Sequence, residues 1–340
     1  LLSSLSVARM FLGLPPEGTP GETLREWKST LQSLGTLDVA LEGAGTRFEG
    51  RARLRASEGS GPGRFARAAR GAPHTLAGFL SKEGTILYLE TSLDAATLAR
   101  FLPGGFPGMG PVPFVPPGAL GPVAAELAAH LDGREVLAVG HEGKDLFVEE
   151  LAGLRDGPAY AALLVSDRFA NAIEGAVASL AFLQGAACER NAFRHGDVDV
   201  HRLRFELRGG GVAGPAWLPE RVRDAVDRFG VACFAVVGDL LVAADGADAE
   251  TRIRALLDRV RAGRLDRPPL AASLGSSRGR LAGFALDLAA GARAFAGGRS
   301  PEWFGGKVSA TLEARDGALE VSAFADIRSP FPDGLLGMPR

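Results

Sequence analysis

The sequence predicts an α+β fold in which curved antiparallel sheets carry helices packed on one face. Apolar runs joined by short Gly- and Asp-containing turns recur along the chain, and such hairpins require antiparallel pairing. Helical segments with a single apolar stripe lie between them, and helices of this kind cover one face of a sheet. The order of strand, helix and hairpin also returns, so we expect pseudo-repeated strand–helix–hairpin units.

Composition is that of a folded chain with no large excess of either charge. Of the 340 residues, 46% are hydrophobic and 23% charged, and the formal net charge is −2. A balanced charge supplies no global basic field, so we predict that nucleic acid is not a partner. No run reaches the ~18 apolar residues that a membrane-spanning helix needs, so we expect no transmembrane segment in this chain.

The first predicted elements are a hairpin and a strand followed by a helix. Residues 37–56 alternate and turn at a Gly-rich loop, which favours a hairpin. Residues 85–92 are β-branched and aromatic, which favours a strand. A short helix should follow, with Leu98, Phe101 and Leu102 on one side. Two short strands, 135–139 and 146–151, complete this unit.

The second predicted unit begins with a strand at 159–165. Ser166 or Asp167 should then cap an amphipathic helix that leads to a strand at 198–207. A hairpin spans 231–244 and turns at Gly238 and Asp239. An amphipathic helix follows it, with its apolar positions at Ile253, Leu256, Leu257 and Val260.

The third predicted unit lies at the C-terminal end of the chain. Residues 281–288 form a strand that runs into a short Ala-rich segment. Residues 307–327 form the clearest hairpin, in which apolar and polar residues alternate on both sides of Asp316 and Gly317.

Glycine and proline divide the chain into two predicted α+β units, 1–153 and 158–340. The first contains a Pro/Gly-rich loop, 103–122, which holds seven prolines and six glycines and is flanked by phenylalanines. Long loops of this kind are often functional. Two interpretations stay open, a hydrophobic flap over a groove and an extended connector whose Phe side chains fill the core.

The most suggestive polar cluster is His195, Asp197, Asp199 and His201. Alternate strand residues share a face, and imidazole and carboxylate groups suit a transition metal. Successive members are, however, about 6.6–7 Å apart along a strand, too far to converge on one ion without a bend. A solvated strand face explains the pattern better, so we predict no metal ligands.

Two further patterns resemble catalytic or phosphate-binding motifs. Gly275, Ser277 and Gly279 fit the G-x-S-x-G elbow of hydrolases, but that motif needs a strand before it and a helix after it, and here a strand follows. Residues 104–110 are Gly-rich, yet prolines remove amides that would face a phosphate and no helix follows. We therefore predict no nucleotide, no cofactor and no catalytic residue.

The strand–helix–hairpin segments resemble those of bacterial exported or lipoprotein-like proteins of unknown function. Four segments carry the resemblance, at residues 86–102, 161–177, 231–257 and 308–327. The resemblance implies a periplasmic or envelope-associated location. It assigns no catalytic residues, so none are transferred to this chain.

The sequence thus predicts a non-catalytic envelope protein, either an interaction or scaffold module or a carrier with an apolar groove. Its partners would be other envelope proteins or a lipophilic ligand. The alternative is a hydrolase, based on Ser277 or on a metal held between His195 and His201. Whether Cys188 and Cys233 form a disulfide is left open, because both begin strand-like runs that could be neighbours.

Overall fold

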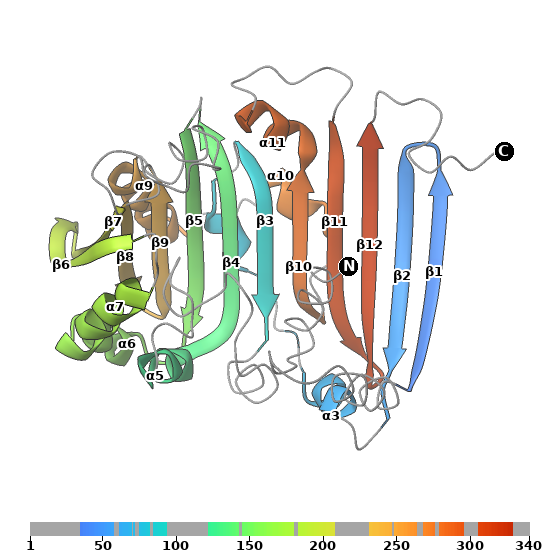
Figure 1. The fold of residues 1–340 in the computed structure, drawn as a ribbon, viewed down its shortest axis with the longest axis horizontal. Coiled ribbons are helices and arrows are strands. Elements are labelled where there is room, and N and C mark those ends of the chain that lie inside the picture. The colour runs from blue at the N-terminus through green and yellow to red at the C-terminus, as the bar shows by residue number, and fades with distance from the viewer. Residues whose placement is uncertain are drawn as a thin grey trace.

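The computed structural model contains one antiparallel sheet of twelve strands (Figure 1). It describes residues 35–57, 61–69, 71, 75–81, 84–93, 122–142, 145–179, 183–207, 231–246, 248–263, 268–275, 279–295 and 305–328. The strand order across the sheet is β1-β2-β12-β11-β10-β3-β4-β5-β9-β8-β7-β6. The strands are β1 (Thr36–Ala44), β2 (Arg47–Arg55), β3 (Thr85–Ser92), β4 (Leu131–Glu142), β5 (Asp145–Leu154), β6 (Leu183–His195), β7 (Val198–Leu207), β8 (Val231–Val237), β9 (Leu240–Gly246), β10 (Arg280–Asp287), β11 (Gly305–Arg315) and β12 (Ala318–Arg328).

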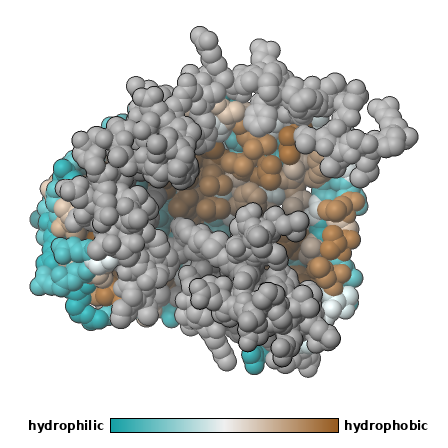
Figure 2. Space-filling view, in the orientation of Figure 1, coloured by the Kyte–Doolittle hydropathy of each residue, from teal (hydrophilic) through white to brown (hydrophobic). Residues whose placement is uncertain are grey.

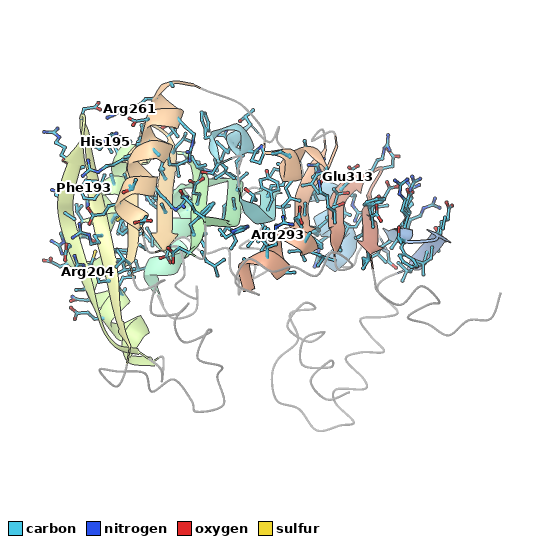
Figure 3. The ribbon with its side chains drawn as sticks, turned by 90° about the horizontal axis from the view of Figure 1, so that it is seen from above. Phe193, His195, Arg204, Arg261, Arg293 and Glu313 are labelled. Atoms are coloured by element: carbon cyan, nitrogen blue, oxygen red, sulfur yellow. The ribbon has the colours of Figure 1, made fainter. Side chains whose placement is uncertain are left out.

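Helices pack on both faces of this sheet (Figure 3). We call the side that faces the viewer in Figure 1 the front face and the opposite side the rear face. The helical elements are α3 (Gly61–Ala68), η1 (Leu76–Phe79), α5 (Pro122–His130), α6 (Gly157–Leu164), α7 (Asp167–Ser179), α9 (Ala249–Arg261), α10 (Pro269–Ala272) and α11 (Leu288–Phe295).

The predicted fold class is therefore wrong. The protein is mainly one large antiparallel sheet with few helices, and the described helices cover both of its faces, so it is not an α+β protein with helices on one face. An apolar stripe shows that a helix covers a sheet, but it does not show which face the helix covers. The predicted pseudo-repeated strand–helix–hairpin units also misjudge how the strands associate, because all twelve join a single sheet.

The turns form where the residue types require them. Gly45 and Gly238, each the first residue of a two-residue loop, have φ values of 62° and 55°. This is the conformation that type II′ hairpin turns require at that position. Asp316 and Gly317 both have positive φ, as a type I′ turn requires. The hairpins predicted at 37–56, 231–244 and 307–327 are confirmed as β1–β2, β8–β9 and β11–β12.

One predicted strand is a helix. Residues 159–165 belong mostly to α6, because Asp156 accepts a hydrogen bond from the backbone N–H of Ala159, at 2.9 Å, and Pro158 occupies the first turn. These are N-terminal capping features, and they override the apolar run that favoured a strand. The strand predicted at 85–92 is confirmed as β3.

The core has a rear part and a front part. On the rear face, α9, α10 and η1 pack on the strands through side chains such as Ile253, Leu256 and Leu270. On the front face, α5, α6 and α7 pack on β5, β9, β8 and β7 through Leu127, Tyr160 and Phe169. None of the helices in the described part of the chain combines the length and hydrophobicity needed to cross a lipid bilayer.

The sheet continues across the predicted boundary between residues 153 and 158, because β5 pairs with β9 over seven residues, Phe147–Gly153. The division into two units stays a prediction. The Pro/Gly-rich loop 103–122 lies outside the described residues except for Pro122, which begins α5.

A buried ion pair lies on the rear face at the centre of the sheet. The Arg280 guanidinium contacts the Glu90 carboxylate, and neither side chain is exposed. The Tyr88 hydroxyl donates a hydrogen bond to the same carboxylate at 2.6 Å, and Arg280 Nη2 donates to the carbonyl oxygen of Leu274 at 2.6 Å. Because Glu90 is on β3 and Arg280 on β10, the pair links two strands that are far apart in the sequence.

We expect Arg280→Met to lower the free energy of unfolding by about 3–5 kcal/mol, because it leaves the Glu90 charge buried without its cationic partner. The double variant Arg280→Met/Glu90→Gln should lose clearly less. Arg53→Met is the matched control, because Arg53 contacts Glu320 at the surface and should change stability by about 1 kcal/mol or less. Urea unfolding measures all four proteins, and a double variant as unstable as Arg280→Met would contradict the expectation.

Candidate functional site

A row of mostly apolar residues crosses eleven strands on the front face of the sheet. Residues that pair directly on neighbouring strands point to the same face, so the pairing register identifies the members of a row. From β1 to β7, this row consists of Leu41, Gly50, Ala323, Ala310, Phe284, Leu89, Leu137, Glu150, Ala243, Phe234 and His201.

The centre of this front face is covered less than the rear face behind it. On β10, Phe284 and Leu286 point to the front and are half-buried, whereas Ala285 points to the rear and is fully buried. On β3, Leu89 is half-buried at the front, and Tyr88 is fully buried at the rear. Figure 2 shows hydrophobic side chains on this face, over the central strands.

A second exposed apolar area lies at the β1 edge of the same face. Leu37, Val39 and Leu41 of β1 have 58%, 59% and 81% of their surface exposed, and Phe48 and Val321 of the adjoining strands are also exposed. The rear face of the same strands is charged, and there Arg53 contacts Glu320 with 3.1 Å between Nε and Oε1. We call these five apolar residues the edge patch.

Two glutamates interrupt the apolar front face beneath α6. Glu135 of β4 and Glu150 of β5 hydrogen bond to each other and are both buried. Tyr160 of α6 interacts electrostatically with both carboxyl groups. Its ring packs edge-on against that of His130, with the ring centroids 6.5 Å apart. Glu135 Oε1 has no hydrogen-bond partner among the described residues.

Burial determines the protonation of this pair. It raises the pKa of Glu135 to about 8, because the charged form loses its hydration. Burial also raises the pKa of Glu150, and the Glu135 carboxyl raises it further by charge repulsion and by hydrogen bonding. Burial, together with both carboxyl groups, raises the pKa of the Tyr160 hydroxyl. The pair therefore carries protons near neutral pH, and this part of the front face is close to uncharged.

Asp245 is a third acid on the front face. It lies on β9 opposite Val148, is completely buried, and accepts a hydrogen bond from the backbone N–H of Gly246. Burial raises its pKa to about 8. Its second carboxyl oxygen has no hydrogen-bond partner in the part of the chain that the structure describes. Protonation of Asp245 near neutral pH therefore extends the uncharged part of the face to β9.

The acids of the rear face have cationic partners instead. Glu149, next to Glu150 on β5, accepts hydrogen bonds from the Ser81 backbone N–H and hydroxyl, both at 2.7 Å. It also pairs with Arg259 of α9, with 2.9 Å between Nη2 and Oε1. Neighbouring glutamates on one strand thus occupy two different electrostatic environments.

The structure separates the residues of the metal-site hypothesis. Three of them contact different neighbours near the β6–β7 turn, where Figure 3 labels His195 and Arg261. These contacts are His195 Nε2 to Asp258 Oδ1 at 2.7 Å, Asp197 to the Arg261 guanidinium, and Asp199 Oδ1 to Arg194 Nε at 3.4 Å. Within the described ranges, no group of three or more His, Cys, Asp or Glu side chains is arranged to hold a metal ion.

His201, the fourth residue of that hypothesis, is buried in the front-face core. Its Nδ1 accepts a hydrogen bond from the backbone N–H of Asn191 at 3.1 Å, and its ring lies 5.4 Å from that of Phe234. Burial lowers the pKa of His201, so its neutral form is favoured. His201 is thus a core histidine, separated from His195 by a change of sheet face.

The remaining predicted chemistry divides between described and undescribed residues. Ser277 lies outside the described part of the chain, so the structure does not test the hydrolase elbow. Cys188 and Cys233 are both free thiols. They point to opposite faces, because Cys188 pairs with Leu203 at the front and Cys233 packs in the rear core. Burial raises the pKa of Cys233 to about 11, which makes it unreactive.

Sequence reasoning did not identify the Glu135–Glu150 pair as a site. The sequence does contain an indication. Glu135 falls on the same side of its strand as Leu137 and Val139, and Glu150 falls on the same side as Val148 and Ala152. An acid at an apolar position of a strand indicates either burial or a special environment.

Comparison with known proteins gives no relative for this fold. No protein-family model, no curated protein and no solved structure matches the chain.

The buried acids predict that the protein loses stability as the pH rises. Their folded pKa values exceed the unfolded ones, so their stabilising effect is complete below about pH 4 and is lost progressively toward pH 8. Each such proton contributes up to about 1.4 kcal/mol per pH unit. Glu150→Gln should reduce the difference in unfolding free energy between about pH 5 and about pH 8.

Glu149→Gln is the matched control for Glu150→Gln. It lies one residue away on the rear face and loses its pairing with Arg259, so it should be less stable at both pH values. A Glu150→Gln protein with the same pH dependence as the wild type would contradict the assignment. Urea unfolding followed by tryptophan fluorescence and circular dichroism measures both variants.

Proposed function

We propose that this protein is a non-catalytic carrier that holds an elongated apolar molecule against the centre of its front face. The half-buried apolar side chains on β3 and β10 carry the proposal. Side chains at the centre of a large sheet are normally packed, as Tyr88 and Ala285 are on the rear face. Leu89 and Phe284, which pair directly, keep part of their surface available for contact with another apolar molecule.

The charge state of the face supports an uncharged or largely apolar occupant. Glu135 and Asp245 have pKa values raised to about 8, so both are largely protonated near neutral pH. Ligand sites are mostly apolar, with a few polar groups that orient the ligand, and this face has that composition. An extended acyl chain would fit the central row better than a compact polar substrate.

We further propose that the protein is located in the cell envelope, as its sequence resemblance implies. Other envelope proteins would then deliver the ligand or receive it. A metal-dependent hydrolase is not favoured, because His195, Asp197 and Asp199 contact separate partners and His201 lies in the core.

The test uses the full chain and a fluorescent fatty acid as the probe. Native mass spectrometry of the purified protein should show bound lipid, and the probe should bind and be displaced by unlabelled fatty acid. Phe284→Asn should weaken probe binding about tenfold or more, because an aromatic side chain contributes about 1.5–3 kcal/mol when its contact is buried.

Leu41→Asn is the matched control, because Leu41 lies on the same face at the exposed β1 edge and should leave probe affinity unchanged. Circular dichroism checks that both variants are folded. A protein that carries no lipid and binds no probe would exclude the carrier. Equal loss in both variants would place binding elsewhere on the face.

A further inference from the structure

The strand order of the sheet is symmetric about its centre, which makes β1 the counterpart of β8. Read outward from the central β10–β3 pair, the order is β10-β11-β12-β2-β1 on one side and β3-β4-β5-β9-β8 on the other. Along the chain, the first half consists of the hairpin β1–β2, the strand β3 and the hairpin β4–β5, and the second half consists of β8–β9, β10 and β11–β12. The second hairpin of each half pairs with the first hairpin of the other half, through β5 with β9 and through β12 with β2.

The two counterpart strands differ in what covers their outer edge. The β8 edge pairs with β7 through Val231 to Phe234. In the part of the chain that the structure describes, no strand pairs with the outer side of β1, and all nine of its residues are exposed. Three common devices that protect an edge are missing from β1, because it contains no lysine or proline and its register with β2 has no bulge.

The hairpin geometry shows which backbone groups of β1 are available. In a hairpin with a two-residue loop, the flanking residues Ala44 and Arg47 form a hydrogen-bonded pair. Every second residue from Ala44 therefore bonds to β2, and Leu37, Val39 and Leu41 direct their N–H and C=O groups outward. The same three residues supply three of the five side chains of the edge patch on the front face.

We propose that two copies of this chain associate through antiparallel pairing of their β1 strands, which joins the two sheets into one. This inference is independent of the carrier function, because it uses the edge and not the centre of the front face. The strand is self-complementary in the register that places Val39 opposite Val39 of the second copy. Leu37 then lies opposite Leu41, and Asp38 lies opposite Ala40.

Charge distinguishes this register from its neighbours. A shift that pairs Ala40 with its own copy would set Asp38 opposite Glu42, and a shift the other way would set Asp38 opposite itself. Like charges directly opposite each other on paired strands are destabilising. The Val39-centred register avoids both contacts, and it makes the two edge patches continuous across the join.

Sedimentation equilibrium of the full chain tests the proposal. The wild type should have a mass of twice 35.4 kDa, whereas a monomer at the highest soluble concentration would overturn the proposal. Val39→Lys and Val39→Asp should each raise the dissociation constant of the dimer at least tenfold, because like charges then oppose each other. An equimolar mixture of the two variants should restore association.

Val321→Lys is the matched control, because Val321 is an exposed apolar residue of the same face on β12, two strands from the edge. It should dimerise as the wild type does. Dimers that are insensitive to charge at position 39 would place the interface elsewhere and refute β1 pairing. Probe binding by the Val39 variants, measured in parallel, should be unchanged, so failure of this inference and failure of the carrier function are distinguishable.

A cysteine variant provides a second test if the charged variants do not fold. Hydrogen-bonded antiparallel partners have Cα atoms about 5.5 Å apart, which is within disulfide range. Val39→Cys should form a covalent dimer under mild oxidation, whereas Ala40→Cys, which faces the other side, should not. Equal cross-linking of the two variants would contradict the register.

Discussion

The pairing of β3 with β10 is the contact on which the rest of the structure depends. It joins residues about 190 positions apart at the centre of the described sheet, and the two other pairings between the halves, β2 with β12 and β5 with β9, lie on either side of it. Side chains reinforce the backbone ladder there, because the hydroxyls of Thr91 and Ser92 donate hydrogen bonds to the carbonyl oxygens of Leu281 and Arg280. The buried contact between Arg280 and Glu90 adds an electrostatic link between the same strands.

Buried glutamates are neutralised in different ways on the two faces of the sheet, because the helices packed on each face carry different side chains. On the rear face, α9 supplies Arg259 to Glu149, so this acid is compensated by a cation. On the front face, α6 supplies Tyr160, which is itself an acid, so Glu135 and Glu150 can lower their charge only by retaining protons. An apolar and nearly uncharged front face is therefore a consequence of helix composition, and it is the surface that a carrier of acyl chains would need.

Local features of the fold were predictable from the sequence, and long-range features were not. The Asp316–Gly317 turn and β3 follow from residue types within a few positions. The mistaken strand at 159–165 shows the limit, because an apolar run fits a buried strand and a buried helix equally, and only the Asp156 cap distinguishes them. Strand order depends on pairings such as β3–β10 that leave no local pattern. The sequence shows Glu135 and Glu150 only as acids on the apolar side of their strands, and nothing in it indicates that the two carboxyl groups contact each other.

The asymmetry between the two halves explains why, among the described residues, the large exposed apolar side chains of the front face lie at the β1 end. The segment α6, α7, β6 and β7 is inserted after β5 and has no counterpart among the described residues of the other half. Its helices cover the front face of β8 and β9 through Phe169 and Ile173, and its strand β7 covers the β8 edge. Without the insertion, the symmetric strand order would leave an apolar hairpin face and an unpaired edge on both sides of the sheet. The insertion covers the face and pairs with the edge on the β8 side only, so the edge patch and the β1 edge remain uncovered together on the other side. In the proposed dimer, a second copy pairs with β1 as β7 pairs with β8.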